Sequence, residues 1–213
     1  MLDRLIAKEL QAHFPCGTIG QRIIVLEQTG STNDAILHVA WPQGAAVSSP
    51  PSRTNEGLVL FAEHQTSGRG QRGNRWESAV GKGLWFSILL RPKIQINDSG
   101  RLTIWAIEAI ADVIRTEFAL EPTIKLRNDV QLYGRKVAGV LVEMRAQEKA
   151  PHLAIVGVGI NVNQSLEDFP PELRNRAISL AMALQRPVDR QKFAVVLLRN
   201  LDRTYRARFA PKR

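Results

Sequence analysis

The hydrophobic positions along the chain follow two periodicities, and each predicts a different kind of element. Short apolar runs bounded by glycine, proline or polar residues are typical of buried β-strands. Such runs predict strands at 22–28, 58–64, 83–92, 123–126 and 152–162. A longer run from Val130 to Met144 is interrupted by Tyr133-Gly134-Arg135, which predicts a β-hairpin that turns at those three residues.

Four other segments have the spacing of amphipathic helices. Residues 101–120 have apolar side chains near helical spacing, and residues 189–209 have one apolar face, formed by Val196, Leu197, Leu201 and Tyr205. Residues 31–41 begin with Ser-Thr-Asn, which are typical N-cap residues, and a proline follows the predicted helix. The N-terminal residues 1–14 predict the fourth helix.

Together these elements predict an α+β fold, with a mixed, largely antiparallel sheet flanked by helices. Neither an internal repeat nor a clear domain boundary divides the 213 residues, so we expect one domain over 1–213. The proline- and serine-rich segment 42–57 predicts an exposed loop.

The composition is that of a globular protein, with 44% hydrophobic and 23% charged residues. Cys16 is the single cysteine, so the chain cannot form an internal disulfide and a reducing compartment fits it best. The chain lacks any apolar run near the ~20 residues that span a bilayer, and its first residues lack the apolar core of a signal peptide. We therefore expect a soluble, cytoplasmic protein that does not associate with a membrane.

The net charge of +9 is concentrated at one end of the chain. Between Arg186 and Arg213 there are nine lysines and arginines against two acidic residues. A solvated helix face is the ordinary interpretation of such a segment. A DNA-binding domain more often carries its basic residues as a stripe across the fold. A non-enzymatic, basic nucleic-acid-binding protein stays open as an alternative.

The segment "SGRGQRGNRW", residues 67–76, is the first candidate for chemistry. Glycine costs ordering entropy and neighbouring arginines repel, so the loop needs a ligand or a function that offsets both costs. Its glycines allow the backbone to approach an anion, its arginines suit phosphate or carboxylate, and its tryptophan offers a flat surface. A flexible tract that binds RNA is the alternative. The loop follows a buried strand and is not of low complexity, which favours an ordered pocket.

Three further motifs are each compatible with a purely structural role. "STN" (31–33) can be a helix cap, and "GVGINVN" (157–163) can be a tight strand end. "KLRND" (125–129), followed by "GRKVAGVLVE" (134–143), can be a solvated turn. The predicted hairpin nevertheless gathers four charged residues, which are Lys125, Asp129, Lys136 and Glu143.

Taken together and in this order, these motifs resemble the catalytic domain of the biotin protein ligases. The resemblance runs from "STN" through "GRG.RG..W", "K..ND", "RK.AG.L.E" and "G.GIN.N" to Ser179-Leu180, and so covers nearly all of the chain. It implies a biotin/lipoate ligase-like fold, which is related to class II aminoacyl-tRNA synthetases. It also implies a ligase that uses ATP and Mg²⁺ to join biotin to a lysine of a carrier protein through biotinyl-5′-AMP.

The resemblance implies roles for individual residues. Catalysis would depend on Lys136, Arg69 and Asp129, with Asp129 orienting Mg²⁺ or the incoming lysine. Biotin would be bound by Ser31, Thr32, Asn33, Gln65, Gly68, Arg69, Gly70, Lys136 and Gly139. The nucleotide would be bound by Arg69, Arg72, Trp76, Lys125, Asn128 and Asn161.

The same resemblance implies which partners the protein has. The expected partner is the biotin carrier domain of a biotin-dependent carboxylase, such as acetyl-CoA carboxylase. We expect no DNA binding, because a helix-turn-helix region does not precede "STN", and we expect the family's small C-terminal β-domain to be absent. The oligomeric state is not fixed, and a homodimer is one candidate.

Many family members have arginine at the positions of Gln71 and Asn74, and Trp-Pro at the positions of Leu126-Arg127. The first pair of changes weakens the positive charge of the loop, and the second alters the nucleotide side. A lipoate or octanoate protein ligase shares the fold and stays open as the second enzymatic interpretation.

Overall fold

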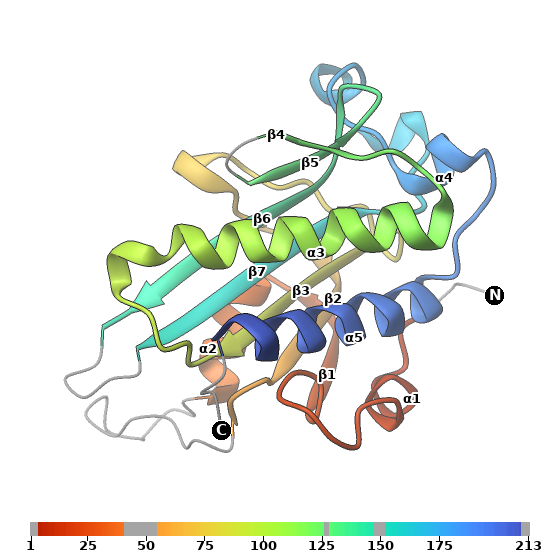
Figure 1. The fold of residues 1–213 in the computed structure, drawn as a ribbon. Coiled ribbons are helices and arrows are strands. Elements are labelled where there is room, and N and C mark those ends of the chain that lie inside the picture. The colour runs from red at the N-terminus through yellow and green to blue at the C-terminus, as the bar shows by residue number, and fades with distance from the viewer. Residues whose placement is uncertain (1–3, 41–54, 126–127, 147–151, 210–213) are drawn as a thin grey trace.

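The computed structural model describes residues 4–40, 55–125, 128–146 and 152–209. Its centre is one seven-stranded sheet with the strand order β1-β2-β3-β7-β6-β5-β4 (Figure 1). The strands are β1 (Ile23–Thr29), β2 (Val59–Gln65), β3 (Gly83–Leu90), β4 (Thr123–Lys125), β5 (Asp129–Leu132), β6 (Arg135–Arg145) and β7 (Leu153–Asn161). The α-helices are α1 (Ala7–Ala12), α2 (Thr32–Ala40), α3 (Gly100–Phe118), α4 (Leu180–Leu184) and α5 (Arg190–Phe209).

The sheet is mixed and largely antiparallel, which confirms the predicted fold class. Strands β1 and β2 pair in parallel, with α2 between them in the sequence, and the other five neighbouring pairs are antiparallel. The predicted hairpin is formed by β5 and β6. Its turn is at Tyr133 and Gly134, which both have positive φ, as a two-residue turn with the twist of the strands requires.

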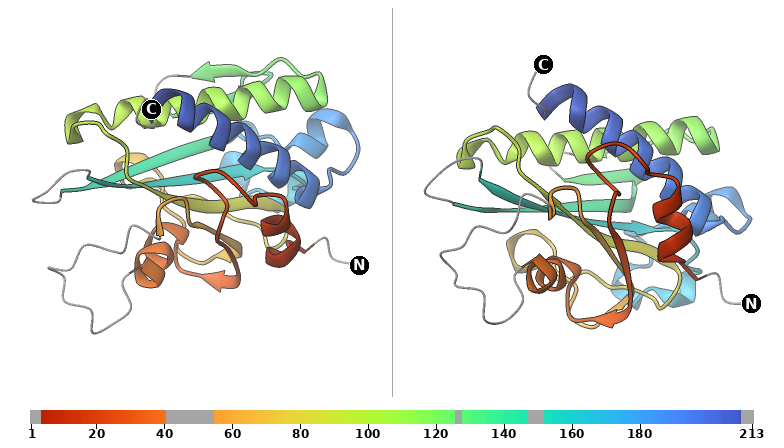
Figure 2. Two further views of the ribbon diagram at one scale, coloured as in Figure 1. Left: turned by 60° about the horizontal axis from the view of Figure 1, so that its bottom comes forward. Right: turned by 90° about the horizontal axis from the view of Figure 1, so that it is seen from below.

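Helices cover the sheet unequally on its two faces (Figure 2). Helices α3 and α5 pack on one face, where the main core contains alternate residues of β7 such as Val156, Val158 and Ile160. On the other face, Leu153 and Ile155 belong to a smaller core with Ile36 of α2. Strand geometry places Gly157 and Gly159 on this second face as well. The second face therefore changes from a packed core to a glycine surface along β7.

Buried polar contacts connect the N-terminal segment and α5 to the sheet. Arg190, at the start of α5, has no exposed side-chain surface and forms an ion pair of 2.8 Å with Glu63 of β2. The other oxygen of Glu63 accepts a hydrogen bond from the backbone of Leu5. Removal of one partner from such a buried pair leaves an uncompensated charge, so this contact fixes both segments against the sheet.

The helix boundaries differ from the prediction mainly at the chain ends. Within the predicted helix at 1–14, α1 covers Ala7–Ala12, residues 4–6 are not helical and the backbone N–H of Leu5 donates to Glu63, whereas residues 1–3 lie outside the described residues. Most of the predicted loop at 42–57, and the pair Leu126-Arg127, lie outside the described residues. Within the described part of the chain, every helix is too short or too polar to cross a membrane.

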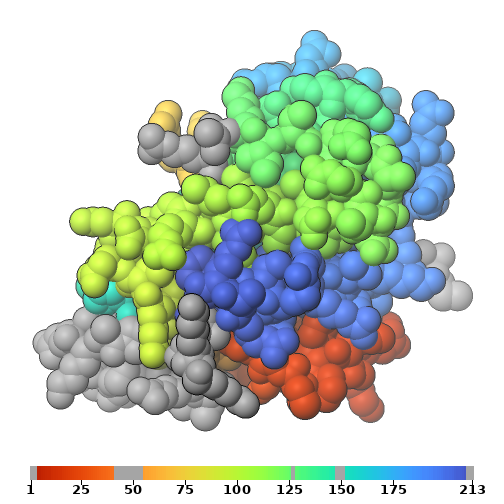
Figure 3. All heavy atoms as spheres, viewed as in Figure 1, coloured from red at the N-terminus to blue at the C-terminus, as the bar shows by residue number. Residues whose placement is uncertain are grey.

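The apolar face predicted for the last helix is confirmed. Leu197, Leu201 and Tyr205 are buried and Val196 is partly buried, and Trp105 of α3 packs against Tyr205 with ring centroids 5.5 Å apart. The arginines of α5 that face outward have local partners, such as Arg208 with Glu108 at 2.6 Å. In the space-filling view, the atoms of α5 lie between those of α3 and those of the N-terminal segment (Figure 3).

Candidate active site

Three glycines on the second face of the sheet make room for two side chains. A Cβ atom at Gly157 would lie 2.3 Å from Oδ1 of Asn33, and one at Gly159 would lie 2.4 Å from the indole of Trp76. Gly139 pairs with Gly159 across β6 and β7, and its Cβ would lie 2.9 Å from the same indole. These distances are shorter than any real contact, so only glycine permits this packing.

A first hollow of about 430 Å³ opens over this glycine surface. Eight of the nine predicted biotin residues line it, namely Ser31, Thr32, Asn33, Gln65, Arg69, Gly70, Lys136 and Gly139. The ninth, Gly68, packs against the backbone of Trp76, where a Cβ would lie 2.5 Å from the carbonyl oxygen. The structure therefore brings together residues that are more than one hundred positions apart in the sequence.

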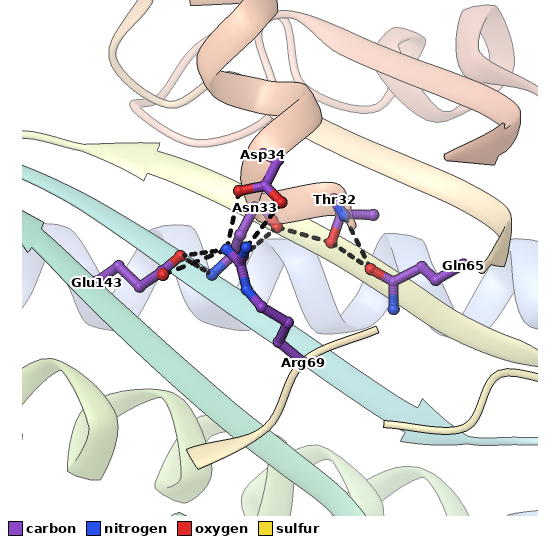
Figure 4. Close-up of polar contacts among 7 residues, drawn as sticks. Thr32, Asn33, Asp34, Gln65, Arg69 and Glu143 are labelled. Carbon is purple, nitrogen blue, oxygen red and sulfur yellow. Dashed lines mark hydrogen bonds and ion pairs between the residues drawn. The ribbon is translucent and has the colours of Figure 1, made fainter. Parts of the chain in front are cut away.

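Hydrogen bonds fix the polar wall of this hollow. Oε1 of Gln65 accepts from the backbone N–H of Thr32 at 2.8 Å and lies 3.1 Å from its hydroxyl. The hydroxyl of Ser87, on β3, lies 2.8 Å from Oγ1 of Thr32 and 2.6 Å from Oδ1 of Asn33. Nδ2 of Asn33 donates to Glu143 at 2.6 Å. The side chains of Thr32 and Asn33 are thus held before any ligand binds (Figure 4).

The segment 67–76, called the glycine–arginine loop from here on, forms a small hairpin, which confirms the prediction of an ordered structure. Gly70 N–H donates to the carbonyl of Asn74 at 2.7 Å, and Trp76 N–H donates to the carbonyl of Gly68 at 2.9 Å. Arg72 lies at the tip with a positive φ of 58° and is exposed. Arg72 lines neither hollow in the described structure. Its contact with a nucleotide stays a prediction.

Arg69 reaches from the loop to two carboxylates (Figure 4). Its guanidinium binds Asp34 through two hydrogen bonds of 2.7 and 2.9 Å, and binds Glu143 at 3.2 Å. Burial lowers the pKa of Arg69, but the hydrogen bond to Asp34 and the charge of Glu143 outweigh this effect, so the pKa lies above its ordinary value. Arg69 is therefore a permanent cation at the edge of the first hollow.

Lys136 lies between the first hollow and a second one. Its Nζ is 2.6 Å from Oδ1 of Asp129 and 5.2 Å from the ring centroid of Trp76. The buried Nε1 of Trp76 has no hydrogen-bond partner among the residues that the structure describes. Both Lys136 and Trp76 line the two hollows. A cation and a flat ring therefore occupy the boundary between the two spaces.

The second hollow, of about 1260 Å³, is lined by three of the six predicted nucleotide residues. Lys125, Asn161 and Trp76 line it, whereas Asn128 lines the first hollow instead. The amide of Asn161 is already used, since Nδ2 donates to the carbonyls of Lys136 and Ile178 and Oδ1 accepts from Gln164. Asn161 consequently supports the wall of the hollow through its side chain.

Sequence reasoning missed several residues of the site. Ser87 could have been found, because it is the one polar residue in the apolar run "LWFSILL" of β3. Arg176 lines the second hollow, but no local pattern in the sequence marks it. Asp34 directly follows the motif "STN" and was missed; Glu143 was noted as a charged residue of the hairpin, but its contact with Arg69 was not predicted, because that contact joins separate segments.

The site offers few ligands for a metal ion. Among the residues that the structure describes, no three His, Cys, Asp or Glu side chains are grouped closely enough to hold one. Asp129 and Glu77 both line the second hollow. Mg²⁺ commonly uses one or two carboxylates together with substrate phosphates, so the residues present fit a metal that arrives with a nucleotide.

Comparison with known proteins assigns the class. Residues 38–161 match the model of the Biotin/lipoate A/B protein ligase family. The chain belongs to that family, and its sheet and flanking helices are those of the biotin protein ligase fold.

Three relatives make the similarity more specific. The bifunctional ligase/repressor BirA of Bacillus spizizenii is 32% identical over 203 residues, or 95% of this chain and 59% of the relative. The biotin--[acetyl-CoA-carboxylase] ligase of Mycobacterium tuberculosis is 33% identical over 87% of this chain and 65% of the relative. The structure of the Aquifex aeolicus biotin protein ligase in complex with biotin and ATP matches with a TM-score of 0.68 and 27% identity, covering 89% of this chain and 74% of that one. The chain thus spans about three fifths of the length of the Bacillus relative.

Proposed function

We propose that this protein uses ATP to ligate biotin to a lysine of a carrier protein through a biotinyl-5′-AMP intermediate. The observation that carries the proposal is the position of Lys136, whose ammonium lies between a small polar hollow and a larger one. A reaction that joins a carboxylate to a phosphate needs a cation at the point where the two substrates meet.

The chemistry of the two hollows supports this assignment of substrates. The first hollow has fixed amide and hydroxyl groups from Thr32, Asn33 and Gln65, which suit the ureido ring of biotin. The second hollow is larger and contains Lys125 and Arg176, which suit the phosphates of ATP. The biotin carboxylate and the α-phosphate would then meet at Lys136 and Arg69. Their mutual repulsion would be offset there, and closure of the loop over them would exclude water from the anhydride.

Asp129 would hold Mg²⁺ together with the phosphates of the nucleotide. The ion supplies positive charge that neutralises the phosphates when it is bound. Asp129 also pairs with Lys136, so the same carboxylate positions the ammonium.

The names of the relatives support a biotin carrier as the partner. The Mycobacterium relative is named for acetyl-CoA carboxylase, so we infer that a carrier domain of a biotin-dependent carboxylase accepts the biotinyl group. Residues 1–213 would form one catalytic domain that acts in the cytoplasm without binding DNA, and a homodimer is the assembly to test first. The family description includes lipoate ligases, but the three relatives favour biotin.

Isothermal titration with biotin, lipoate and an oligonucleotide separates the proposed function from its alternatives. We expect biotin to bind, and we expect pyrophosphate to be released when biotin and Mg-ATP are both present. Binding of lipoate in preference to biotin would indicate a lipoate ligase. Binding of the oligonucleotide alone would indicate that the basic residues serve a nucleic acid.

A further inference from the structure

Glu143 contacts both the polar wall of the first hollow, through Asn33, and the glycine–arginine loop, through Arg69. Among the described residues, it is the only one whose hydrogen bonds reach both. It lies on β6, with a side chain about one-third exposed. One of its oxygens accepts from Nδ2 of Asn33 at 2.6 Å, and the same oxygen lies 3.2 Å from Nη2 of Arg69. The close-up shows these two contacts converging on one carboxylate (Figure 4).

The contact with Asn33 decides which way the amide faces. Oδ1 of Asn33 lies 2.6 Å from the hydroxyl of Ser87, and Nδ2 lies against Glu143. A carboxylate can only accept hydrogen bonds, so the amide cannot flip without losing its contact with Glu143, whereas the hydroxyl of Ser87 can accept as well as donate. Asn33 is 3% exposed, and a buried amide that lost its partners would be costly. Glu143 therefore fixes which atoms of Asn33 remain available to a ligand.

The contact with Arg69 acts on the loop. Asp34 and Glu143 together place two negative charges around one guanidinium, whose side chain is 42% exposed. Partly exposed ion pairs of this kind contribute little to stability. The anionic groups of a substrate can therefore replace the two carboxylates without a large cost. The two ion pairs of Arg69 hold the loop over the first hollow, and they are weak enough to be exchanged for contacts with a substrate.

We propose that Glu143 is a positioning residue that fixes the amide of Asn33 for biotin and holds Arg69 until the substrate's anionic groups replace it. The proposal rests on the proposed function, because it takes biotin as the ligand of the first hollow. The proposal adds a contact that connects the polar wall of the first hollow with the loop that would close over the activated intermediate.

Two substitutions of Glu143 separate its two contacts. Glu143→Gln keeps an oxygen that can accept from Asn33, but it removes the negative charge beside Arg69 and replaces the second oxygen with an NH₂ group, so the contact with the loop is weakened while the contact with Asn33 is kept. Glu143→Ala removes both contacts. Glu108→Gln is the matched control, since Glu108 is an exposed glutamate that pairs with Arg208 between α3 and α5, on the other face of the sheet.

The experiment measures the Kd of biotin by titration and the rate of tryptic cleavage within residues 67–76, mapped by mass spectrometry. We expect E143Q to bind biotin within threefold of the wild type, while its unliganded loop is cleaved at least threefold faster. We expect E143A to show the same faster cleavage and at least a tenfold higher Kd. Asn33→Ala added to E143A should raise the Kd little further, because Glu143 acts through Asn33. The control E108Q should match the wild type in both measurements.

Either of two results would overturn the proposal. One is E143A binding biotin as tightly as the wild type, and the other is E143Q showing wild-type loop cleavage. If E143A fails to fold, the E143Q cleavage rate still decides the contact with the loop. If the wild type itself does not bind biotin, the proposed function is wrong and the biotin part of this proposal falls with it, whereas the cleavage of unliganded protein still tests the hold on Arg69.

Discussion

The side chain of Lys136 lies across Gly139, and its ammonium reaches Asp129 at 2.6 Å. A Cβ atom at Gly139 would be 2.9 Å from Cε of Lys136 and from the Trp76 ring, so a larger residue there would displace the end of the lysine side chain or the ring. Asp129 pairs with Gly139 in the register of β5 and β6, which places its carboxylate within reach of the ammonium. The ammonium therefore has a fixed place between the two hollows before any substrate binds.

This arrangement predicts the effect of removing the ammonium. Lys136→Met keeps most of the apolar stem but leaves the two substrate anions without their shared cation. We expect formation of biotinyl-5′-AMP to slow by about 100-fold or more, the loss typical of a charged contact in the transition state. Pyrophosphate release at saturating biotin measures the rate. Lys93→Met, at an exposed lysine outside both hollows, should retain the wild-type rate, and a wild-type rate in Lys136→Met would refute the assignment.

The glycine surface predicts a second outcome. In Gly159→Ala the new Cβ would lie 2.4 Å from the Trp76 indole, so the ring has to leave its place between the two hollows. We expect about tenfold weaker binding of a stable biotinyl-adenylate analogue, equivalent to about 1.4 kcal/mol. Gly100→Ala is the control, because no atom lies within 4 Å of the position of its Cβ. Equal affinity in both variants would show that the position of Trp76 does not matter for binding.

The loop predicts a third outcome through its missing charges. Gln71 and Asn74 lie on the small hairpin, and Nδ2 of Asn74 donates to the carbonyl of Gln71 at 2.9 Å. Adding two cations by Gln71→Arg and Asn74→Arg should slow release of biotinyl-5′-AMP by about fivefold, as expected for about 1 kcal/mol at a partly exposed site. The lifetime of preformed intermediate, followed by HPLC, measures this. The difference in lifetime between the two proteins should shrink in high salt. Equal lifetimes at low salt would show that the added charges do not affect retention of the intermediate.

A fourth outcome concerns stability and pH. Asp168 forms an ion pair of 2.6 Å with Lys82 and accepts hydrogen bonds from Ser165. Burial raises the pKa of Asp168, but the contacts with Lys82 and Ser165 lower it by more than burial raises it. The pKa therefore lies below its ordinary value. The contact therefore stabilises the fold fully above the unfolded pKa of about 4, and this stabilisation is lost as the pH falls through the lowered value.

Asp168→Asn should accordingly lower the free energy of unfolding by about 1 kcal/mol at pH 7. The difference from the wild type should decrease as the pH is lowered below about 4. Urea titrations at pH 7, 4 and 3 measure it. A difference that is the same at all three pH values would contradict the role of the charge.

The strands and longer helices could be predicted because their signals are local. The apolar run of β3 and the helical spacing in α3 depend only on neighbouring residues, and both elements were found within two residues of their predicted ends. The first helix is present but, within the described residues, shorter than predicted, and the contact made just before it is non-local. Leu5 bonds to Glu63, which is 58 positions away, and Glu63 in turn pairs with Arg190.

For the candidate site, the residues could be predicted from the sequence but their contacts could not. The residues that line the first hollow were predicted from a resemblance to a family, since no local pattern connects Gln65 with Gly139. Their contacts could not be predicted, because Arg69 finds Glu143 only after β6 and the loop have taken their places. Asn161 was expected to bind the nucleotide, yet its amide bonds to two carbonyls and to Gln164, and those partners become neighbours only in the folded sheet.

The central claim is that this protein transfers biotin to a carrier. The most direct test is to incubate it with biotin, Mg-ATP and a carrier domain of a biotin-dependent carboxylase, and to measure the mass of the carrier. We predict that the carrier gains the mass of one biotinyl group on a single lysine, only when biotin and ATP are both present, and much more slowly with Lys136→Met. An unchanged carrier mass in the complete reaction, or a gain from lipoate and not from biotin, would contradict the account.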